Sequence, residues 1–348
     1  MTHLLRNIII ILIALTIFST AYYFYDGIYN HSNLKQIDII YRVKPSSSAK
    51  EVAFDLARQN ILSDPYPLLA YLFASGNLKN IKAGAYEISS NMTGRQIAEI
   101  LTNGKTAQLK LTIVEGWDLA KIGAYLQSQN FGTIQDFYNI TGKPAEAQNK
   151  NAAFHNTLVP QFKFLEDCPA QASLEGFLFP DTYYVSIDAS LENIVTQMLI
   201  NFDNKLTPQM REDIKKQNKS IYEIVTMASI LEKEVKTLDD KKIVAGILWK
   251  RLRNGQPLQA DATILYALQI QNPDNIYTKF TEIDSPYNTY KYKGLPIGPI
   301  SNPGLDSLIA AIYPAPSDYW YYLSKPSGET VYSKNFTEHV IAKNKYLN

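Results

Sequence analysis

The segment Ser220–Val235 carries an acidic side chain at a position where a helix would bury it. At about 100° per residue, Glu232 falls on the same arc as the apolar residues Ile221, Ile224, Val225, Ala228, Leu231 and Val235. Lys233 and Glu234 are expected to point away from that arc, toward solvent. Burial raises the pKa of a carboxyl group, and a general acid that works near neutral pH needs such a raised pKa. Glu232 is therefore a candidate acid–base catalyst.

The same spacing is compatible with a structural role. An acid on an apolar face costs free energy unless it is neutralised or hydrogen-bonded, and a neighbouring Lys or Arg would satisfy it as well as catalysis would. Ser220 and Glu223 have the spacing of a capping box, which fixes where this helix begins. Spacing alone leaves both interpretations of Glu232 open.

Four stretches of the chain have distinctive sequences rich in polar residues, glycine and proline. They are LEGFLFPDTYYV (Leu174–Val185), MASILEKEV (Met227–Val235), LQADATILYAL (Leu258–Leu268) and SPYNTYKYKGLPIGPISNP (Ser285–Pro303). In this order they closely resemble the endolytic murein transglycosylases of the MltG, or YceG-like, family, and the resemblance covers nearly the whole chain. Two departures are visible: Ala262 stands where family members often carry proline, and 141–171 resembles an enlarged loop.

The resemblance implies roles for particular residues. Its catalytic glutamate is the first acid of the A-S-I-x-E-K-E stretch, which is Glu232 here. Three further motifs imply a substrate cleft built by Glu175 and Asp181, by Gln259 and Asp261, and by Tyr287 and Asn288. For Asp181 and Asp261 a role as helix or loop caps remains equally open.

The resemblance also implies the reaction. Ordinary glycosidases pair two carboxylates, one as acid and the other as nucleophile or base. A lytic transglycosylase instead uses the C6 hydroxyl of the muramic acid as nucleophile, so that one acid suffices. The expected reaction cleaves the MurNAc–GlcNAc β-1,4 bond inside nascent glycan strands, leaves 1,6-anhydroMurNAc ends and terminates strand elongation. Peptidoglycan synthases are expected partners.

Two rival functions are weaker. Ser47-Ser-Ala-Lys50 matches the S-x-x-K motif of serine acylases, but it overlaps a capping box at Ser48, and neither K-T-G nor G-x-S-x-G occurs in the chain. A non-catalytic alternative is a peptidoglycan-binding or division scaffold, in which the N-terminal module does the binding. A scaffold would tolerate the loss of Glu232, whereas an enzyme would not.

Composition excludes several other classes. The 348 residues are 46% hydrophobic and 19% charged with a net charge of +1, which is typical of a globular protein and not of a nucleic-acid binder. Cys168 is the only cysteine, and the four histidines are far apart in the sequence. We therefore expect neither a metal nor another cofactor.

The N-terminal segment Ile8–Tyr25 is an uncharged apolar run of the length that a membrane-spanning helix needs. Ser19 and Ala21 form a small-x-small signal-peptidase site, but the run continues beyond it, which favours a retained anchor. The charges flanking the run do not fix its orientation. The function implies residues 1–7 in the cytoplasm and the catalytic domain on the periplasmic side of the inner (plasma) membrane.

The remainder predicts an α+β protein. Residues 36–113 alternate strand and helix patterns, with strands near 37–43, 84–88 and 107–114, and the resemblance implies a LysM-like module here. Residues 114–348 predict a mainly helical catalytic domain with short strands at 319–323 and 330–333. The loop Ser285–Gly304 is too long for a turn, and ordered loops of that length are usually functional.

Overall fold

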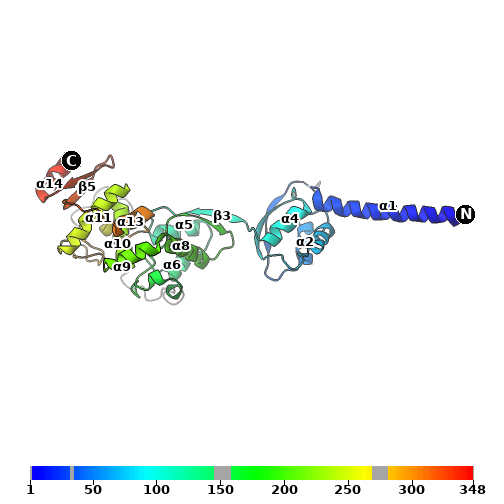
Figure 1. Ribbon diagram of the computed structural model, residues 1–348, viewed down its shortest axis with the longest axis horizontal. Helices are drawn as coiled ribbons and strands as arrows, with labels where there is room; N and C mark the ends of the chain where they lie inside the picture. The colour runs from blue at the N-terminus through cyan, green and yellow to red at the C-terminus, as the bar shows by residue number, and fades with distance from the viewer. Residues whose placement is uncertain (1, 32–34, 145–157, 269–280, 348) are drawn as a thin grey trace. The chain divides into compact units, whose positions relative to one another are not determined.

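The computed structural model describes residues 2–31, 35–144, 158–268 and 281–347. The enlarged loop expected at 141–171 lies partly outside these ranges. The chain divides into two compact units (Figure 1). Unit one comprises Met1–Lys110 and Tyr184–Asp188, and unit two comprises Leu111–Tyr183 and Ala189–Asn348. The chain crosses between the units within two paired strands, β3 (Gln108–Thr112) and β4 (Thr182–Ser186).

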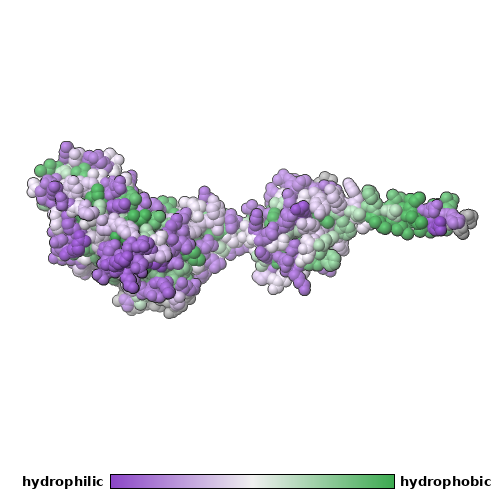
Figure 2. Space-filling model, viewed as in Figure 1, coloured by the Kyte–Doolittle hydropathy of each residue, from purple (hydrophilic) through white to green (hydrophobic). Residues whose placement is uncertain are grey.

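Unit one begins with a long apolar helix, α1 (Thr2–Tyr29). Its residues His3–Tyr29 have a mean hydropathy of 2.1, long and apolar enough to cross a membrane. Figure 2 shows the hydrophobic colour along most of this helix. The expected apolar segment Ile8–Tyr25 therefore lies within a single helix.

The rest of unit one is a small α/β module. Strands β1 (Asp38–Val43) and β2 (Gly84–Ser89) pair antiparallel, and Tyr41 lies opposite Tyr86. Three helices complete the module: α2 (Ala49–Arg58), α3 (Tyr66–Ala74) and α4 (Gly94–Asn103). The capping boxes that the sequence predicts at Ser48 and Thr93 are both present. The core buries side chains from every element, among them Val43, Leu56, Leu72, Ile88 and Leu101.

Unit two is mainly helical. In chain order its helices are α5 (Leu119–Ser128), α6 (Ile134–Thr141), the short 3-10 turns η1 (Val159–Gln161) and η2 (Lys163–Leu165), α8 (Leu191–Lys205), α9 (Pro208–Lys216), α10 (Ile221–Glu234), α11 (Leu238–Arg253), α12 (Asp261–Ala267), α13 (Leu305–Ile312) and α14 (Phe336–Tyr346). Strands β5 (Tyr321–Ser324) and β6 (Thr330–Ser333) form an antiparallel hairpin. A mixed fold of helices and small sheets agrees with the α+β class predicted from the sequence.

Helix α10 is the central helix of unit two. Its capping box at Ser220 and Glu223 is present as predicted. It packs against α9, α11, α12 and α13, and every residue from Ile224 to Leu231 is buried, Thr226 and Ser229 included. The middle of the helix is therefore enclosed on all sides, and exposed residues occur only near its two ends, at Glu223 and Lys233.

Three elements were not anticipated from the sequence: α6, α12 and β4. Asn302-Pro303 has the sequence pattern of a helix start, but α13 begins at Leu305, with Gly304 as its N-cap. Asn302 cannot serve as the cap because its side chain is used in the interior. Its Oδ1 accepts from Leu178 N at 2.9 Å, and its Nδ2 donates to Trp117 O at 2.9 Å.

Candidate active site

Two acids close the C-terminal turn of α10, and the structure places them in different environments. Glu232 and Glu234 are two positions apart, so they project about 200° apart around the helix axis. The sequence placed Glu232 on the buried face and Glu234 in solvent. The second part of that prediction is wrong: Glu234 is partly buried and hydrogen-bonded. Tyr322 of β5 and the start of α12 cover the Glu234 side chain, whereas its neighbour Lys233 is exposed.

Glu234 has the environment of a protonatable acid. Burial, and then the charge of Asp261, raise the pKa of the Glu234 carboxyl to about 7. Hydrogen bonds from the Tyr322 hydroxyl, at 3.1 Å from Oε2, and from the Ala262 amide oppose that rise. A carboxyl with this pKa can both donate and accept a proton near neutral pH, which is what a single acid–base catalyst must do.

Glu234 also lines a pocket of about 480 Å³, which we call the Glu234 pocket. Its walls come from the end of α10, the end of α11, the start of α12, strand β5 and helix α14. The lining includes Arg251, Gln259, Asp261, Tyr290, Tyr321, Tyr322 and His339. A concave site of this size with several convergent polar groups is typical of ligand binding.

The two residues of the L-Q-x-D motif meet Glu234 in this pocket. Gln259 and Asp261 are both exposed there, and the Asp261 carboxylate accepts a hydrogen bond from the Tyr290 hydroxyl. Gln259 has a left-handed backbone (φ 53°), a conformation that costs a residue with a side chain about 1–2 kcal/mol. Its amide donates to Thr289 O at 3.1 Å, which ties the two motifs together. Strained residues of this kind cluster at functional sites.

Two basic side chains complete the lining. Arg251 is 6% exposed and donates to the carbonyls of Leu258 (2.8 Å) and Trp320 (3.0 Å), so it is rigidly held. The His339 ring stacks on the Tyr321 ring, with the two ring centroids 5.2 Å apart. Its buried Nδ1 has no hydrogen-bond partner among the described residues. Burial and the charge of Arg251 lower the pKa of His339, which favours a neutral ring. This nitrogen is therefore an unsatisfied buried polar atom at the edge of the Glu234 pocket.

Glu232 lies in an ion pair. Lys241 Nζ lies 3.2 Å from both carboxylate oxygens of Glu232. The Lys241 side chain is 4% exposed and the Glu232 side chain is 9% exposed. Oε2 also accepts from Gly304 N at 2.9 Å and from Ser307 Oγ at 2.6 Å. The pairing with a lysine that the sequence left open for Glu232 is present, and the catalytic assignment of Glu232 stays a prediction. These contacts join α10, α11 and α13.

The environments of the two acids differ. The described contacts of the Glu232 carboxylate come from Lys241, Gly304 and Ser307. Glu234 lines a cavity, and burial raises its pKa to about 7. The structure therefore offers Glu234 as a second candidate acid, and the acid–base role of Glu232 stays a prediction.

Glu175 is an interior residue and does not line the Glu234 pocket. It is 1% exposed, and its carboxylate accepts from Leu119 N at 3.1 Å, Tyr266 Oη at 2.9 Å and Asn302 Nδ2 at 3.0 Å. Burial raises the pKa of Glu175 to about 8. The Glu175 side chain holds together the start of α5, helix α12 and the end of the Ser285–Pro303 loop, and the substrate contact expected for it stays a prediction.

Tyr287 and Asn288 are buried within their own loop. Asn288 is 0% exposed, donates to Thr281 O and Ile283 O, and accepts from the amides of Tyr290 and Lys291. Tyr287 packs edge-on against Tyr266 with ring centroids 5.0 Å apart. Both residues shape the loop, which presents the neighbouring Tyr290 to the pocket.

Asp181 lies away from Glu234 and is exposed at the start of β4. Its Oδ1 accepts from Thr182 N at 2.7 Å and its Oδ2 from Asn201 Nδ2 at 3.0 Å, while Lys205 Nζ lies 3.9 Å away. The Asn201 hydrogen bond is the main reason why the pKa of Asp181 lies below its usual range. This geometry fits the loop-cap role left open for Asp181.

Sequence reasoning missed Glu234, Arg251, Tyr322 and His339 as site residues. Glu234 and Tyr290 stand within the motifs that carry the resemblance, so a signal for them existed. Arg251, Tyr322 and His339 lie in unremarkable helix and strand patterns, and nothing in those patterns marks them. Among the residues that the structure describes, no three His, Cys, Asp or Glu side chains come together as a metal site.

Comparison with known proteins relates this chain to one family. A sequence model described as the YceG-like family matches residues 41–345. A Bacillus subtilis protein named endolytic murein transglycosylase is 33% identical over 312 residues, which cover 88% of this chain and 84% of that protein.

A Streptococcus pneumoniae protein with the same name is 30% identical over 318 residues, which cover 85% of this chain but only 56% of the longer pneumococcal protein. A crystal structure of a YceG-like protein from Listeria monocytogenes superposes with a TM-score of 0.60 at 32% identity. The match covers 89% of this chain and all of that one.

Proposed function

This chain belongs to the YceG-like family, and we propose that its Glu234 pocket is the active site of an endolytic murein transglycosylase. One observation carries the assignment of the site. A carboxyl whose pKa is raised to about 7 lines a polar pocket together with Gln259 and Asp261. Pocket, acid and motif residues thus coincide at a single place in unit two.

The proposed reaction needs one proton donor that later becomes an acceptor. Protonated Glu234 donates to the oxygen of the MurNAc–GlcNAc β-1,4 bond, and the C1–O bond breaks as GlcNAc leaves. The C6 hydroxyl of the same MurNAc attacks C1, and the Glu234 carboxylate takes its proton. A 1,6-anhydroMurNAc end forms, Glu234 is protonated again, and no water is consumed.

Neighbouring groups support the charge that develops. Asp261, held by Tyr290, would stabilise the positive charge on the sugar ring as the C1–O bond breaks. Gln259, which is exposed in the pocket, would bind sugar hydroxyls. The role proposed for Glu232 is structural, because its ion pair with Lys241 fixes the turn in which Glu234 lies.

A second function is favoured by one specific feature, namely that Glu234 and Asp261 line the same pocket. Two carboxyls could perform hydrolysis, with Asp261 as base or nucleophile. Cleavage of sacculi in heavy-oxygen water separates the two functions. A transglycosylase leaves the new muramic ends unlabelled and in the anhydro form, whereas labelled reducing ends would make this chain a hydrolase.

For unit one we propose a glycan-binding and anchoring role. The order β1–α2–α3–β2 supports a LysM-like module that holds the glycan strand. Helix α1 would be retained as a single membrane span, with the catalytic unit on the periplasmic face, where its substrate and the synthases lie. N-terminal sequencing of the mature protein tests the anchor, since a first residue at Tyr22 would show cleavage after Ala21.

A further inference from the structure

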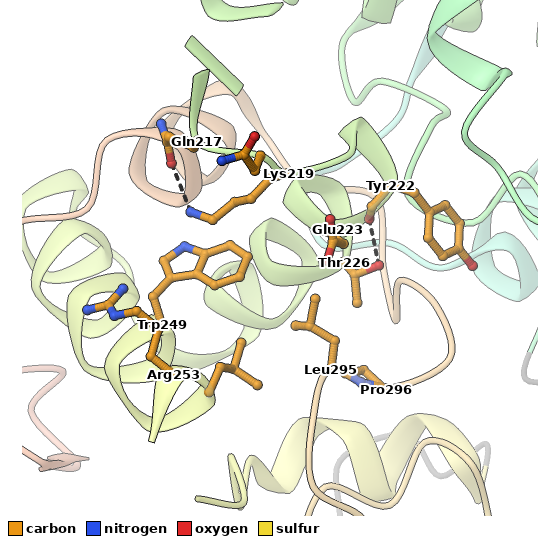
Figure 3. Close-up of a pocket in the computed structure, with 11 residues that line it drawn as sticks. Gln217, Lys219, Tyr222, Glu223, Thr226, Trp249, Arg253, Leu295 and Pro296 are labelled. Atoms are coloured by element: carbon orange, nitrogen blue, oxygen red, sulfur yellow. Dashed lines mark hydrogen bonds between the residues drawn. The ribbon is translucent and has the colours of Figure 1, made fainter. Parts of the chain in front are cut away.

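Unit two has a second pocket, at the N-terminal end of α10. It has a volume of about 690 Å³, and we call it the Lys219 pocket. Figure 3 shows Lys219 beside the ring of Trp249, and Leu295 and Pro296 on the loop near Glu223 and Thr226. Its walls come from α10, the end of α11 and the Gly-Pro-rich part of the Ser285–Pro303 loop. None of its lining residues is shared with the Glu234 pocket.

The pocket holds two positive charges without a carboxylate in contact. Lys219 Nζ lies 3.8 Å from the centroid of the Trp249 ring and donates to Gln217 Oε1 at 2.8 Å, which fixes its position. Arg253 is exposed at the same pocket. No ion pair is described for either residue. Burial and the charge of Arg253 lower the pKa of Lys219, so the two cations repel each other and an anion between them would relieve that repulsion.

The acid in this pocket does not neutralise them by contact. The Glu223 carboxylate accepts from Ser220 N at 2.8 Å and from Ser220 Oγ at 3.1 Å, which commits it to the capping box. The remaining wall is apolar and comes from Leu252, Leu295 and Pro296. A ligand that fits must therefore combine a carboxylate with small apolar groups.

We propose that the Lys219 pocket binds the carboxylate-bearing stem peptide of peptidoglycan. This inference rests on the proposed function, because murein carries such peptides on its MurNAc residues. The alanyl methyl group of the peptide suits the Leu252–Leu295–Pro296 wall, and its free carboxylate suits Lys219 and Arg253. Binding there would select strands that still carry peptides.

The two pockets are placed for one substrate. Tyr222 lines the Lys219 pocket and Glu234 lines the other, at opposite ends of α10. Twelve residues of helix separate them by about 18 Å. A glycan in the Glu234 pocket and a peptide in the Lys219 pocket would thus be held along a single rigid helix.

The test measures binding of the full chain in detergent by titration calorimetry. The probe is a GlcNAc–MurNAc tripeptide, compared with the same disaccharide without its peptide. We expect the peptide-bearing probe to bind more tightly, and Lys219→Met and Arg253→Gln each to weaken it by about 10-fold or more, as expected for loss of a charge-assisted hydrogen bond. Lys215→Gln, which removes an exposed lysine outside both pockets, should change nothing.

Two results would overturn the proposal. One is equal affinity of the two probes. The other is equal affinity of wild type and Arg253→Gln, a change at an exposed residue that leaves the fold intact. Inorganic phosphate that binds with the same dependence on Lys219 and Arg253 and competes fully with the peptide would also overturn it, by revealing a general anion site. If the chain bound the peptide selectively but cut no glycan, the result would contradict the proposed function and leave this inference in place.

Discussion

Replacing Glu232 by Gln removes the carboxylate that pairs with the buried Lys241 ammonium, while Glu115 still interacts with that charge. The lysine side chain is 4% exposed, and its only described hydrogen bonds go to the two Glu232 oxygens. Removing one partner of a buried pair costs about 3–5 kcal/mol. For a domain of this size that lowers Tm by roughly 6–20 °C. Thermal unfolding followed by circular dichroism measures the shift.

A double variant sharpens this prediction. Lys241→Met alone should destabilise to a similar extent, because it leaves the Glu232 carboxylate unpaired. The combination of Glu232→Gln and Lys241→Met should recover most of the loss, since Gln still accepts from Gly304 and Ser307 and no buried charge remains. A Glu232→Gln variant with the Tm of wild type and no glycan cleavage would refute the structural role and return the catalytic role to Glu232.

Three further predictions concern single residues. Tyr322→Phe removes a hydrogen bond that lowers the pKa of Glu234. The alkaline limb of the pH profile of kcat, expected near pH 7, should therefore move to higher pH. A limb that moves to lower pH would contradict the assignment. Glu175 has its pKa raised from 4.5 to about 8, so the folded chain holds a proton that the unfolded chain has lost in this interval. The contribution of Glu175 to the stability of the fold therefore falls as pH rises from about 5 to 8. Glu175→Gln should make the fall of Tm over this pH range shallower. An unchanged slope would count against a raised pKa of Glu175. Gly176→Ala should lower the free energy of unfolding in urea by about 1–3 kcal/mol. Gly176 has a φ of +90°, and the new Cβ would lie 2.6 Å from Val225 Cγ1. An unchanged midpoint would show that the segment relaxes.

The parts of the fold that were predictable depend on local patterns. Local patterns predict the capping boxes at Ser48, Thr93 and Ser220 and the apolar run of α1, because each depends on residues only a few positions apart. Helix α12 was not, because it is short and has no side-chain cap. The start of α13 was misplaced because Asn302 has the type of a cap but uses its side chain in the interior.

The candidate site was predictable only in part. The motifs named Gln259 and Asp261, which do line the Glu234 pocket, but they also named Glu175 and Asn288, which are buried. A helical wheel placed Glu232 on the buried face correctly, but it put Glu234 in solvent because it could not show that β5 packs over that side of α10. Arg251 and His339 reach the pocket from distant segments, and a single sequence does not reveal such convergence.

Cleavage of purified sacculi by Glu234→Gln, assayed by mass spectrometry of the released anhydro-muropeptides, tests the central claim most directly. Gln keeps the shape of the side chain but has no proton to transfer, so turnover should fall by about 10²–10⁴-fold. Tm should stay close to that of wild type, because Glu234 has no buried ion pair to break among its described contacts. Near-normal release of anhydro ends by this variant, with loss of release in a stably folded Glu232→Gln, would contradict the account.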